Sequence, residues 1–320
     1  MRLRVGDPVL VGSGECHALS PGDVSSLGPC VFRLEYEPLS VRDDSRSHEA
    51  TPPPSRLRHD LALAAQIQRS FLPREVIAVE GIDLFAEYRA AYTVGGDFYD
   101  VFWVGPDRLA VFVGDVSGKG VSAALLMARI SSELRVAALA HIDPVTVLTA
   151  MNTATLSRDQ PELFFTVIYF TLDVTTGEIL LANGGHTTPY SRRADGLVEP
   201  VTGGRACPVG ILDDPGFTST RLRLEHGDSL ILYTDGVIEA ASADGSFYGQ
   251  DRLEACLGGA GPRTSHAIAG QILGSVDAHA AGGPVNDDLT IFICQRSVGG
   301  PPTMQPRRRS SSHMPATRVG

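Results

Sequence analysis

Two long apolar segments separated by a tight turn constrain the fold of this chain more than any other feature. Residues 163–173 (LFFTVIYFTLD) and 179–185 (ILLANGG) flank the turn Thr-Thr-Gly-Glu. Branched and aromatic residues on both sides of a short glycine-containing turn predict an antiparallel hairpin. Residues 218–236 predict a second hairpin, with its turn at residues 226–228. Hairpins build antiparallel sheets, so this pattern argues against a doubly wound parallel sheet.

The remaining patterns add further strands and a few helices to these hairpins. Residues 108–115 and 287–295 predict buried strands, because their apolar runs are rich in branched and aromatic side chains. Residues 121–140 predict a strong helix, and residues 248–280 predict helical segments interrupted by Gly and Pro. The expected fold class is therefore α+β with antiparallel sheets.

Composition excludes several classes of function. The 320 residues carry a formal net charge of −10, from 27 basic and 37 acidic side chains. A nucleic-acid binder needs a basic surface to neutralise phosphates, so we expect no nucleic-acid partner. The N-terminus has no apolar signal region, and no run reaches about 18 apolar residues. We therefore expect no membrane partner and a cytoplasmic location.

The five cysteines are widely spread and form no Cys-x-x-Cys pair. This spacing indicates neither a zinc site nor a disulfide framework. We expect reduced structural thiols, as is usual in the cytosol.

Shifts in composition divide the chain into five parts. Residues 1–38 predict a small unit of short strands, and the polar, proline-rich residues 39–56 predict a linker. Residues 57–73 predict a linker helix that ends at its closing proline. Residues 74–296 hold the predicted sheets and helices. Residues 297–320, rich in Gly, Pro, Ser and Arg, predict a disordered tail.

The predicted linker helix has apolar residues at helical spacing, at positions 57, 61, 64, 65 and 71. Such a stripe suits packing of the helix on its own domain. It equally suits a signalling helix in which residues 57–72 pair with a second copy of the chain to form a homodimer. Gln68 lies in the stripe and weakens the second interpretation, so both interpretations stay open.

The stretch VGDVSGKG at residues 113–120 suggests three kinds of site. A nucleotide phosphate loop needs four residues between its glycines and a hydroxyl after the lysine. Here Gly114 and Gly118 enclose three residues, and the lysine precedes a glycine. A nucleophile elbow needs Gly-x-Ser-x-Gly, and Ser117 stands in the wrong frame. The remaining candidate is Asp115, which ends an apolar strand beside glycines that let the backbone approach a ligand.

The same signature, an aspartate where a strand meets a loop, recurs along the chain. Asp97 follows two glycines, and Asp235 stands between a strand and a glycine. Asp287 and Asp288 open the last predicted strand. One such aspartate alone would indicate only turn geometry. Four such positions can converge at one edge of the sheets, and with no competing Cys or His cluster they indicate a hard cation such as Mn²⁺ or Mg²⁺.

Six blocks of the sequence occur in an order typical of one enzyme family. They are AAQIQRSFLP (64–73), VGGDFYDVF (94–102), VFVGDVSGKGVSAALLMA (111–128), FFTVIYFTLDVTTGEILLANGGH (164–186), LILYTDGVIEA (230–240) and NDDLTIFI (286–293). The chain resembles the PPM family of metal-dependent Ser/Thr protein phosphatases, in the bacterial branch that includes RsbU and SpoIIE. The resemblance covers about residues 57–296. It implies a four-layer αββα sandwich of two antiparallel sheets flanked by helices, with two metal ions, Mn²⁺ or Mg²⁺, at one end.

The resemblance also implies a set of metal ligands. In chain order these are Asp97, Asp115, the backbone carbonyl of Val116, Asp235 and Asp287, with Asp288 less favoured than Asp287. Asp115 matches the carboxylate that bridges both metals. Two divalent cations lower the pKa of a bridging water and hold the phosphate oxygens. The four aspartates other than Asp288 would thus act through metal-bound water, and no enzyme nucleophile would be needed.

The chain departs from the pattern of many eukaryotic relatives. Val116 and Ser117 stand where those relatives have a histidine proposed as general acid. No clear counterpart exists for the arginine with which they grip phosphate. The bacterial branch shares both gaps, so they do not argue for an inactive protein. We expect His186, in the block NGGH, to be structural.

The resemblance implies a phosphoserine/phosphothreonine protein phosphatase. Its expected substrate is a phosphorylated STAS-type antagonist of an anti-sigma factor in a partner-switching pathway. The alternative is an inactive scaffold that binds a regulatory partner, and the complete set of acidic positions argues against it. Residues 19–37 resemble the last strands of a forkhead-associated domain. Because the phosphate-gripping part of such a domain is missing, we predict no phosphopeptide binding there.

Overall fold

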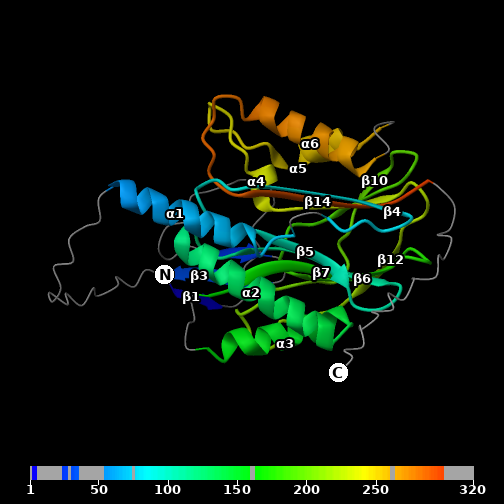
Figure 1. Cartoon of the computed structure of the whole chain (residues 1–320), viewed down its shortest axis with the longest axis horizontal. Helices are drawn as coiled ribbons and strands as arrows, with labels where there is room; N and C mark the ends of the chain where they lie inside the picture. The colour runs from blue at the N-terminus through cyan, green and yellow to red at the C-terminus, as the bar shows by residue number, and fades with distance from the viewer. Residues whose placement is uncertain are drawn as a thin grey trace, which may run out of the picture.

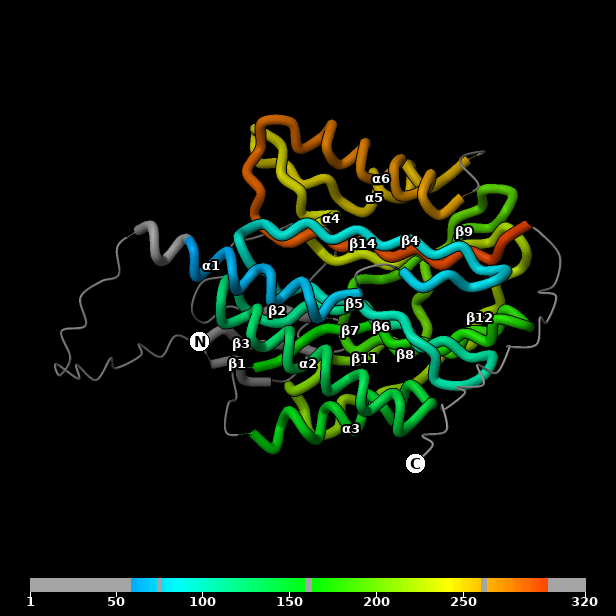
Figure 2. The backbone as a smooth tube through the Cα atoms, in the orientation of Figure 1, coloured from blue at the N-terminus to red at the C-terminus, as the bar shows by residue number. Residues whose placement is uncertain are grey.

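Two sheets lie face to face between two layers of helices (Figures 1 and 2). The computed structural model describes residues 2–5, 24–27, 30–35, 54–73, 76–158, 163–259 and 264–298. The first sheet has the order β10-β9-β13-β14-β4, and all its neighbouring strands are antiparallel. Its strands are β4 (Ile82–Arg89), β9 (Tyr190–Arg192), β10 (Val198–Pro200), β13 (Ser229–Tyr233) and β14 (Leu289–Arg296).

The second sheet has the order β11-β8-β7-β6-β5, and β12 pairs with residues 178–181 of β8, before the residues of β8 that pair with β11. Its strands are β5 (Phe98–Trp103), β6 (Arg108–Val116), β7 (Phe165–Asp173), β8 (Glu178–Gly184), β11 (Arg205–Ala206) and β12 (Thr220–Arg223). The short pairing of β11 with β8 is parallel, and the others are antiparallel. The predicted hairpin over residues 163–185 is confirmed, because β7 and β8 pair with Phe170 opposite Leu181.

Helices cover the outer face of each sheet, which confirms the predicted four-layer αββα arrangement. The helices α2 and α3 pack on the second sheet, and α5 and α6 pack on the first (Figure 1). The helices are α1 (Pro54–Arg69), α2 (Val121–Ala140), α3 (Pro144–Leu156), α4 (Asp235–Ile238), α5 (Gly249–Leu257) and α6 (Ser265–His279). The helix α2 coincides with the predicted residues 121–140.

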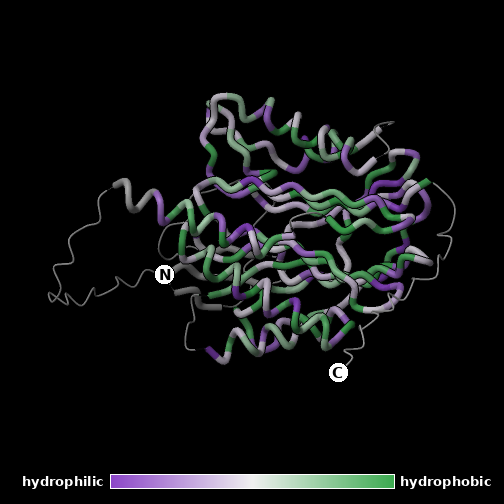
Figure 3. Tube along the Cα trace, in the orientation of Figure 1, coloured by the Kyte–Doolittle hydropathy of each residue, from purple (hydrophilic) through white to green (hydrophobic). Residues whose placement is uncertain are grey.

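Alternating side chains of the central strands enter two separate hydrophobic cores. In β13, Leu230 and Leu232 join the core between the sheets, whereas Ile231 joins the core under α5 and α6. In β14, Phe292 and Ile293 divide in the same way. This alternation follows the two-residue period of a strand. The first sheet is therefore apolar on both faces, and Figure 3 shows hydrophobic residues along its strands.

The predicted hairpin over residues 218–236 is wrong. β12 pairs with β8 in the second sheet, whereas β13 pairs with β9 and β14 in the first. The turn at residues 226–228 thus carries the chain from one sheet to the other. Every residue of β13 is buried, which suits a central strand covered on both faces, while β12 alternates between exposed and half-buried positions. Two strands with such different burial belong to different places in the sandwich.

Smaller corrections concern the boundaries. The helix α1 begins at Pro54, inside the predicted linker, and ends at Arg69, followed by a turn before Pro73. The first residues form a three-stranded sheet of β1 (Arg2–Val5), β2 (Val24–Leu27) and β3 (Cys30–Glu35), in the order β1-β3-β2. Residues 6–23, 36–53 and 299–320, which hold most of the predicted linker and tail, lie outside the described residues.

Two further expectations concern cysteine chemistry and membranes. Cys256 and Cys294 are free thiols, but Cys207 is disulfide-bonded, so the expectation of uniformly reduced thiols is wrong. The thiols therefore give no argument for a reducing compartment. In the part of the chain that the structure describes, no helix has both the length and the apolar character needed to cross a membrane.

Candidate functional site

Asp115 lies near the end of β6, where the strand meets the glycine-rich loop before α2. The segment Gly95-Gly96 passes directly over it. A Cβ atom on Gly96 would lie 2.9 Å from Asp115 Oδ1 and 3.2 Å from the carbonyl oxygen of Val116. Because only glycine permits this approach, the Gly-Gly-Asp loop lies against both predicted ligands.

Asp97 is held between the two sheets, immediately before β5. Its Oδ2 accepts hydrogen bonds from Thr234 Oγ1 at 2.7 Å and Thr290 Oγ1 at 2.6 Å. Thr234 directly precedes Asp235, and Thr290 follows Asp288 by two residues. The two threonines therefore tie Asp97 to the segments that carry the other acidic residues.

Asp235 and Asp287 come from neighbouring strands of the first sheet. Asp235 begins α4 after β13, and Asp287 precedes β14. The two strands are antiparallel, with Tyr233 opposite Ile291, so the end of one lies beside the start of the other. The topology thus brings Asp235 and Asp287 to one edge, where the second sheet supplies Asp115.

The pKa values of these carboxyl groups show how closely they are crowded. Burial, followed by the charges of Asp235, Asp287 and Asp288 in that order, raises the pKa of Asp115 to about 8. Burial, followed by the charge of Asp115, raises the pKa of Asp97 well above its usual range. Burial and then Asp287 raise the pKa of Asp235. These groups repel one another and would be stabilised as anions by a cation placed among them.

Asp288 is engaged differently from Asp287. Its Oδ1 accepts a hydrogen bond from the backbone N–H of Ala91 at 2.8 Å, and its Oδ2 accepts one from Gly96 at 2.6 Å. A Cβ atom on Gly95 would lie 2.0 Å from Oδ2. Both oxygens of Asp288 therefore clamp the loop that leads to Asp97, whereas Asp287 faces the acidic cluster. This geometry favours Asp287 as a ligand and gives Asp288 a positioning role.

The described residues do not enclose a metal ion by side chains alone. Across them, no three acidic, histidine or cysteine groups form such a cluster. Hard cations such as Mg²⁺ keep several waters and use one or two carboxylates each. The donor set here, carboxylates with an adjacent backbone carbonyl at Val116, has the oxygen chemistry that Mg²⁺ and Mn²⁺ take. The residues therefore fit a metal whose remaining ligands are waters.

Two polar residues of the recognised blocks, Asp100 and His186, lie outside this acidic cluster. Asp100 pairs with Arg135 Nη1 of α2 at 2.5 Å, on the helix-covered face of the sheet. His186 is buried, and its Nδ1 lies 2.8 Å from Thr166 Oγ1. Burial lowers the pKa of His186 to about 3, so the ring is neutral near pH 7. These contacts suit the structural role expected of His186.

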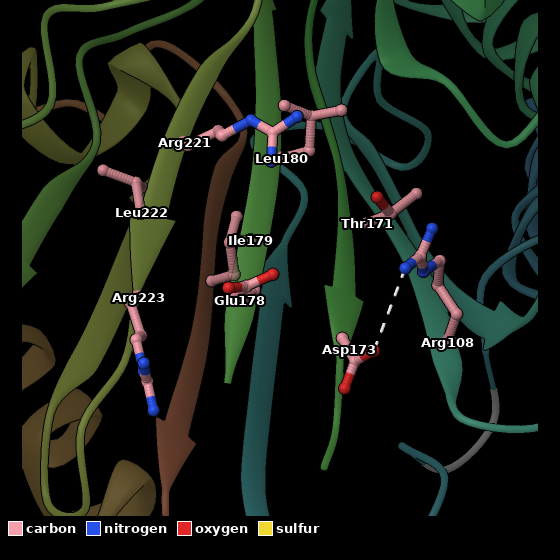
Figure 4. A pocket seen from close by; sticks show the side chains of 9 residues that line it. All are labelled: Arg108, Thr171, Asp173, Glu178, Ile179, Leu180, Arg221, Leu222 and Arg223. Carbon is pink, nitrogen blue, oxygen red and sulfur yellow. Dashed lines mark ion pairs between the residues drawn. The ribbon is translucent and has the colours of Figure 1, made fainter. Parts of the chain in front are cut away.

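A pocket of about 400 Å³ opens elsewhere, on the outer face of the second sheet (Figure 4). Its lining includes Arg108, Asp173 and Arg221. Arg108 begins β6, whereas Asp115 lies near the end of that strand, roughly 23 Å away along an extended chain. The pocket is therefore separate from the acidic cluster.

The fold and these contacts match one family of proteins. The sequence model of the family described as Stage II sporulation protein E (SpoIIE) matches residues 105–297, which include Asp115, Asp235 and Asp287. The chain belongs to the SpoIIE family. The solved SiaA-PP2C domain of Pseudomonas aeruginosa shares its fold, with a TM-score of 0.66 and 23% identity, over 75% of this chain and 97% of that one.

Two curated relatives extend this assignment of the SpoIIE-family chain. Protein IcfG of Synechocystis sp. (strain ATCC 27184 / PCC 6803 / Kazusa) is 28% identical over 270 residues, which are 75% of this chain and 42% of IcfG. Phosphoserine phosphatase RsbU of Bacillus subtilis (strain 168) is 27% identical over 199 residues, which are 59% of this chain and 56% of RsbU. This chain spans about half the length of the curated relatives it matches.

Several contacts of this SpoIIE-family site were missed in the sequence. They are the threonine pair that holds Asp97, the Asp288 clamp, the exposed Glu239 beside Asp235 and Asp287, and the bond between Gln68 and the glycine loop. Burial and the charges of Asp235 and Asp287 raise the pKa of Glu239. Gln68 Nε2 donates to the Gly95 carbonyl, and its Oε1 accepts from Gly95 N–H at 3.1 Å. In the sequence, the one sign of this contact was that Gln68 is a polar residue among the apolar positions of the predicted linker helix.

Proposed function

We propose that this chain is a metal-dependent phosphatase that removes phosphate from phosphoserine and phosphothreonine in proteins. The observation that carries the proposal is the convergence of acidic residues from both sheets on Asp115. Buried carboxylates at such close quarters are costly to keep ionised unless cations balance them. The relative RsbU, named a phosphoserine phosphatase, supports the choice of substrate class.

The proposed metal ligands are Asp97, Asp115, the Val116 carbonyl, Asp235 and Asp287. Two ions, Mn²⁺ or Mg²⁺, would supply an activated water and neutralise the phosphate oxygens when bound. The chain itself supplies the positioning. Thr234 and Thr290 fix one oxygen of Asp97. The Asp288 clamp holds the glycine loop against Asp115.

We propose that the physiological substrate is a phosphorylated STAS-type protein, an antagonist of an anti-sigma factor. Membership of the family of RsbU and SpoIIE supports a place in partner switching. Such a substrate is a folded domain, so the site must be open to a protein surface. Asp287 and Lys119, with side chains 28% and 52% exposed, meet that requirement at the edge of the acidic cluster.

We also propose that residues 74–296 form the phosphatase domain and that α1 mediates a homodimer. Three large apolar side chains of the α1 region stay exposed at a spacing of four residues: Leu63 (49%), Ile67 (54%) and Phe71 (39%). They form an exposed apolar face, which shares only Phe71 with the stripe predicted from the sequence. Gln68 and Leu72 are buried and do not belong to this face. The double substitution Leu63→Glu and Ile67→Glu should convert a dimer to a monomer in light scattering. An unchanged mass would discard the dimer.

Turnover of p-nitrophenyl phosphate tests the proposed activity. The wild type should hydrolyse it with Mn²⁺ and lose activity with a chelator, and Asp115→Asn should lose at least about 100-fold in kcat. Arg221→Met, at the far pocket, is the matched control and should keep wild-type turnover. A well-folded wild type with no Mn²⁺-dependent turnover on this ester or on phosphoproteins would favour the inactive-scaffold alternative.

A further inference from the structure

Lys119 is the only lysine in the sequence, and all the other residues counted as Lys or Arg are arginines. It lies in the loop between β6 and α2, four residues after Asp115. Its Nζ donates to Asp287 Oδ2 at 2.7 Å and to the carbonyl oxygen of Asn286 at 2.7 Å. Its sequence motif indicates no function for it, but the fold places its charge at the edge of the acidic cluster.

The loop leaves the Lys119 side chain free to change partners. Gly118 and Gly120 flank it with φ values of 101° and 74°, and a Cβ atom on either would meet nothing within 4 Å. The side chain is 52% exposed. On the other side of the contact, a cavity of about 120 Å³ lies behind Asn286 and Asp287. Both halves of the ion pair therefore have room to move.

Lysine suits such an exchange better than arginine does. Its ammonium is a compact charge on a flexible stem, whereas the arginine fork is best at holding one fixed bidentate partner. The nearby Arg89 contacts two different carboxylates, because its Nη1 lies 2.8 Å from Asp277 and its Nε 3.3 Å from Glu87. Arg89 is thus already engaged by two carboxylates, while Lys119 has one carboxylate that a metal would also claim.

We propose that Lys119 binds the phosphate of the substrate, and that it exchanges Asp287 for that phosphate when a metal ion takes the Asp287 carboxylate. This inference rests on the proposed function and deepens it. A metal ion and the Lys119 ammonium compete for the same Asp287 oxygens, because both are cations that need them. Once displaced, the ammonium stands at the edge of the site, where a phosphate dianion is its best available partner. Lys119 thereby fills the place of the phosphate-gripping arginine that the sequence lacks.

Selective acetylation tests the exchange without measuring activity. Because Lys119 is the only lysine in the sequence, an acetyl N-hydroxysuccinimide ester labels a single lysine side chain. Mn²⁺ should increase the labelling rate of Lys119 at least threefold by releasing it from Asp287. Inorganic phosphate added with Mn²⁺ should reverse most of this increase. Labelling that responds to neither addition would overturn the proposal.

Metal binding and kinetics of Lys119 variants test the two halves separately. By calorimetry, Lys119→Met should bind Mn²⁺ at least threefold more tightly, because the competing cation is gone. With Mn²⁺ present, it should raise the KM for p-nitrophenyl phosphate and the Ki of inorganic phosphate at least tenfold, whereas Lys119→Arg should recover part of the loss. Arg221→Met is the charge-matched control and should change neither constant.

The outcomes separate this inference from the proposed function. A wild type without Mn²⁺-dependent turnover would refute the phosphatase assignment itself. An active wild type with an equally effective Lys119→Met variant, unchanged in KM, in Ki and in Mn²⁺ affinity, would refute only the role of Lys119.

Discussion

Asp287 and Asp288 are neighbours in the chain, yet the fold engages their carboxylates differently. Asp288 is 5% exposed, and both its oxygens accept backbone N–H groups from the loop that carries Asp97. Asp287 is more exposed and pairs with Lys119 beside the acidic cluster. One step along the chain, just before β14, thus separates a residue that holds the loop from one that faces the acidic cluster.

Substitution of the two neighbours should therefore have unequal effects on the free energy of unfolding. Asp288→Asn replaces one acceptor oxygen by a donor that faces a backbone N–H, so it should lower the free energy of unfolding by about 1–3 kcal/mol. Asp287→Asn removes a partly exposed ion pair but also relieves the repulsion between Asp287 and its neighbours Asp115 and Asp235, so the free energy of unfolding should change by less than about 1 kcal/mol. Urea denaturation in a chelating buffer measures both. Equal losses for the two variants would contradict the division of roles.

Asp115 makes a prediction about pH in the metal-free protein. Its pKa is raised from 3.8 to about 8, first by burial, so the folded protein holds this proton more tightly than the unfolded chain does. Stability from this group is fully present below about pH 4 and is lost as the pH rises to about 8. Asp115→Asn removes that loss, because its amide does not ionise.

The Asp115→Asn variant should therefore melt at a higher temperature than the wild type at pH 8 in a chelating buffer. For a domain of this size each kcal/mol shifts the Tm by about 2–4 °C, so we expect a gain of at least about 5 °C. The gain should shrink as the pH falls towards 5. A variant that melts below the wild type at pH 8 would show that the carboxylate is not under electrostatic stress.

The element that most directly joins the site to the rest of the chain is α1. Gln68 is 6% exposed and exchanges two hydrogen bonds with the backbone of Gly95. Gly95 precedes Gly96, which lies against Asp115 and Val116. A shift of α1 along its axis would therefore move the loop that carries Asp97, which gives the proposed dimer helix a route to the site.

Gln68→Ala should uncouple α1 from this loop. We expect a loss of about tenfold in kcat with Mn²⁺ and a small loss of stability, since two buried backbone groups of Gly95 lose their partners. Gln66→Ala, on the exposed side of the same helix, is the matched control and should leave both unchanged. If the two variants behave alike, α1 does not position the loop.

The pairing of the strands shows which parts of the fold could be predicted from the sequence. The strands at 163–185 were paired correctly because their partners adjoin in the chain and one short turn fixes the register. The pairing over 218–236 failed because local pattern cannot tell a turn within a sheet from a crossing between sheets. The uninterrupted apolar run LILY at residues 230–233, which the structure buries completely, was the overlooked signal. The Gln68 and Asp288 contacts, over 27 and 192–197 residues of sequence, depend on the completed fold.

At the scale of the whole molecule, the candidate site exists only where the two sheets meet. The second sheet supplies Asp115, and the first supplies Asp235 and Asp287 from adjacent strand ends. Asp97 joins the two sheets through Thr234 and Thr290. The acidic residues were predictable one by one from their place at strand ends. Their convergence was predictable only from the family resemblance, because no local pattern specifies how the sheets stack.

The most direct test of the central claim is phosphate release from a serine-phosphorylated STAS protein incubated with this chain. Release should require Mn²⁺ or Mg²⁺, stop with a chelator and fall at least about 100-fold in Asp115→Asn. Intact mass spectrometry of the phosphoprotein measures it directly. Folded wild-type protein that binds the metal but leaves the phosphoserine intact, while a known phosphatase removes it, would contradict the account.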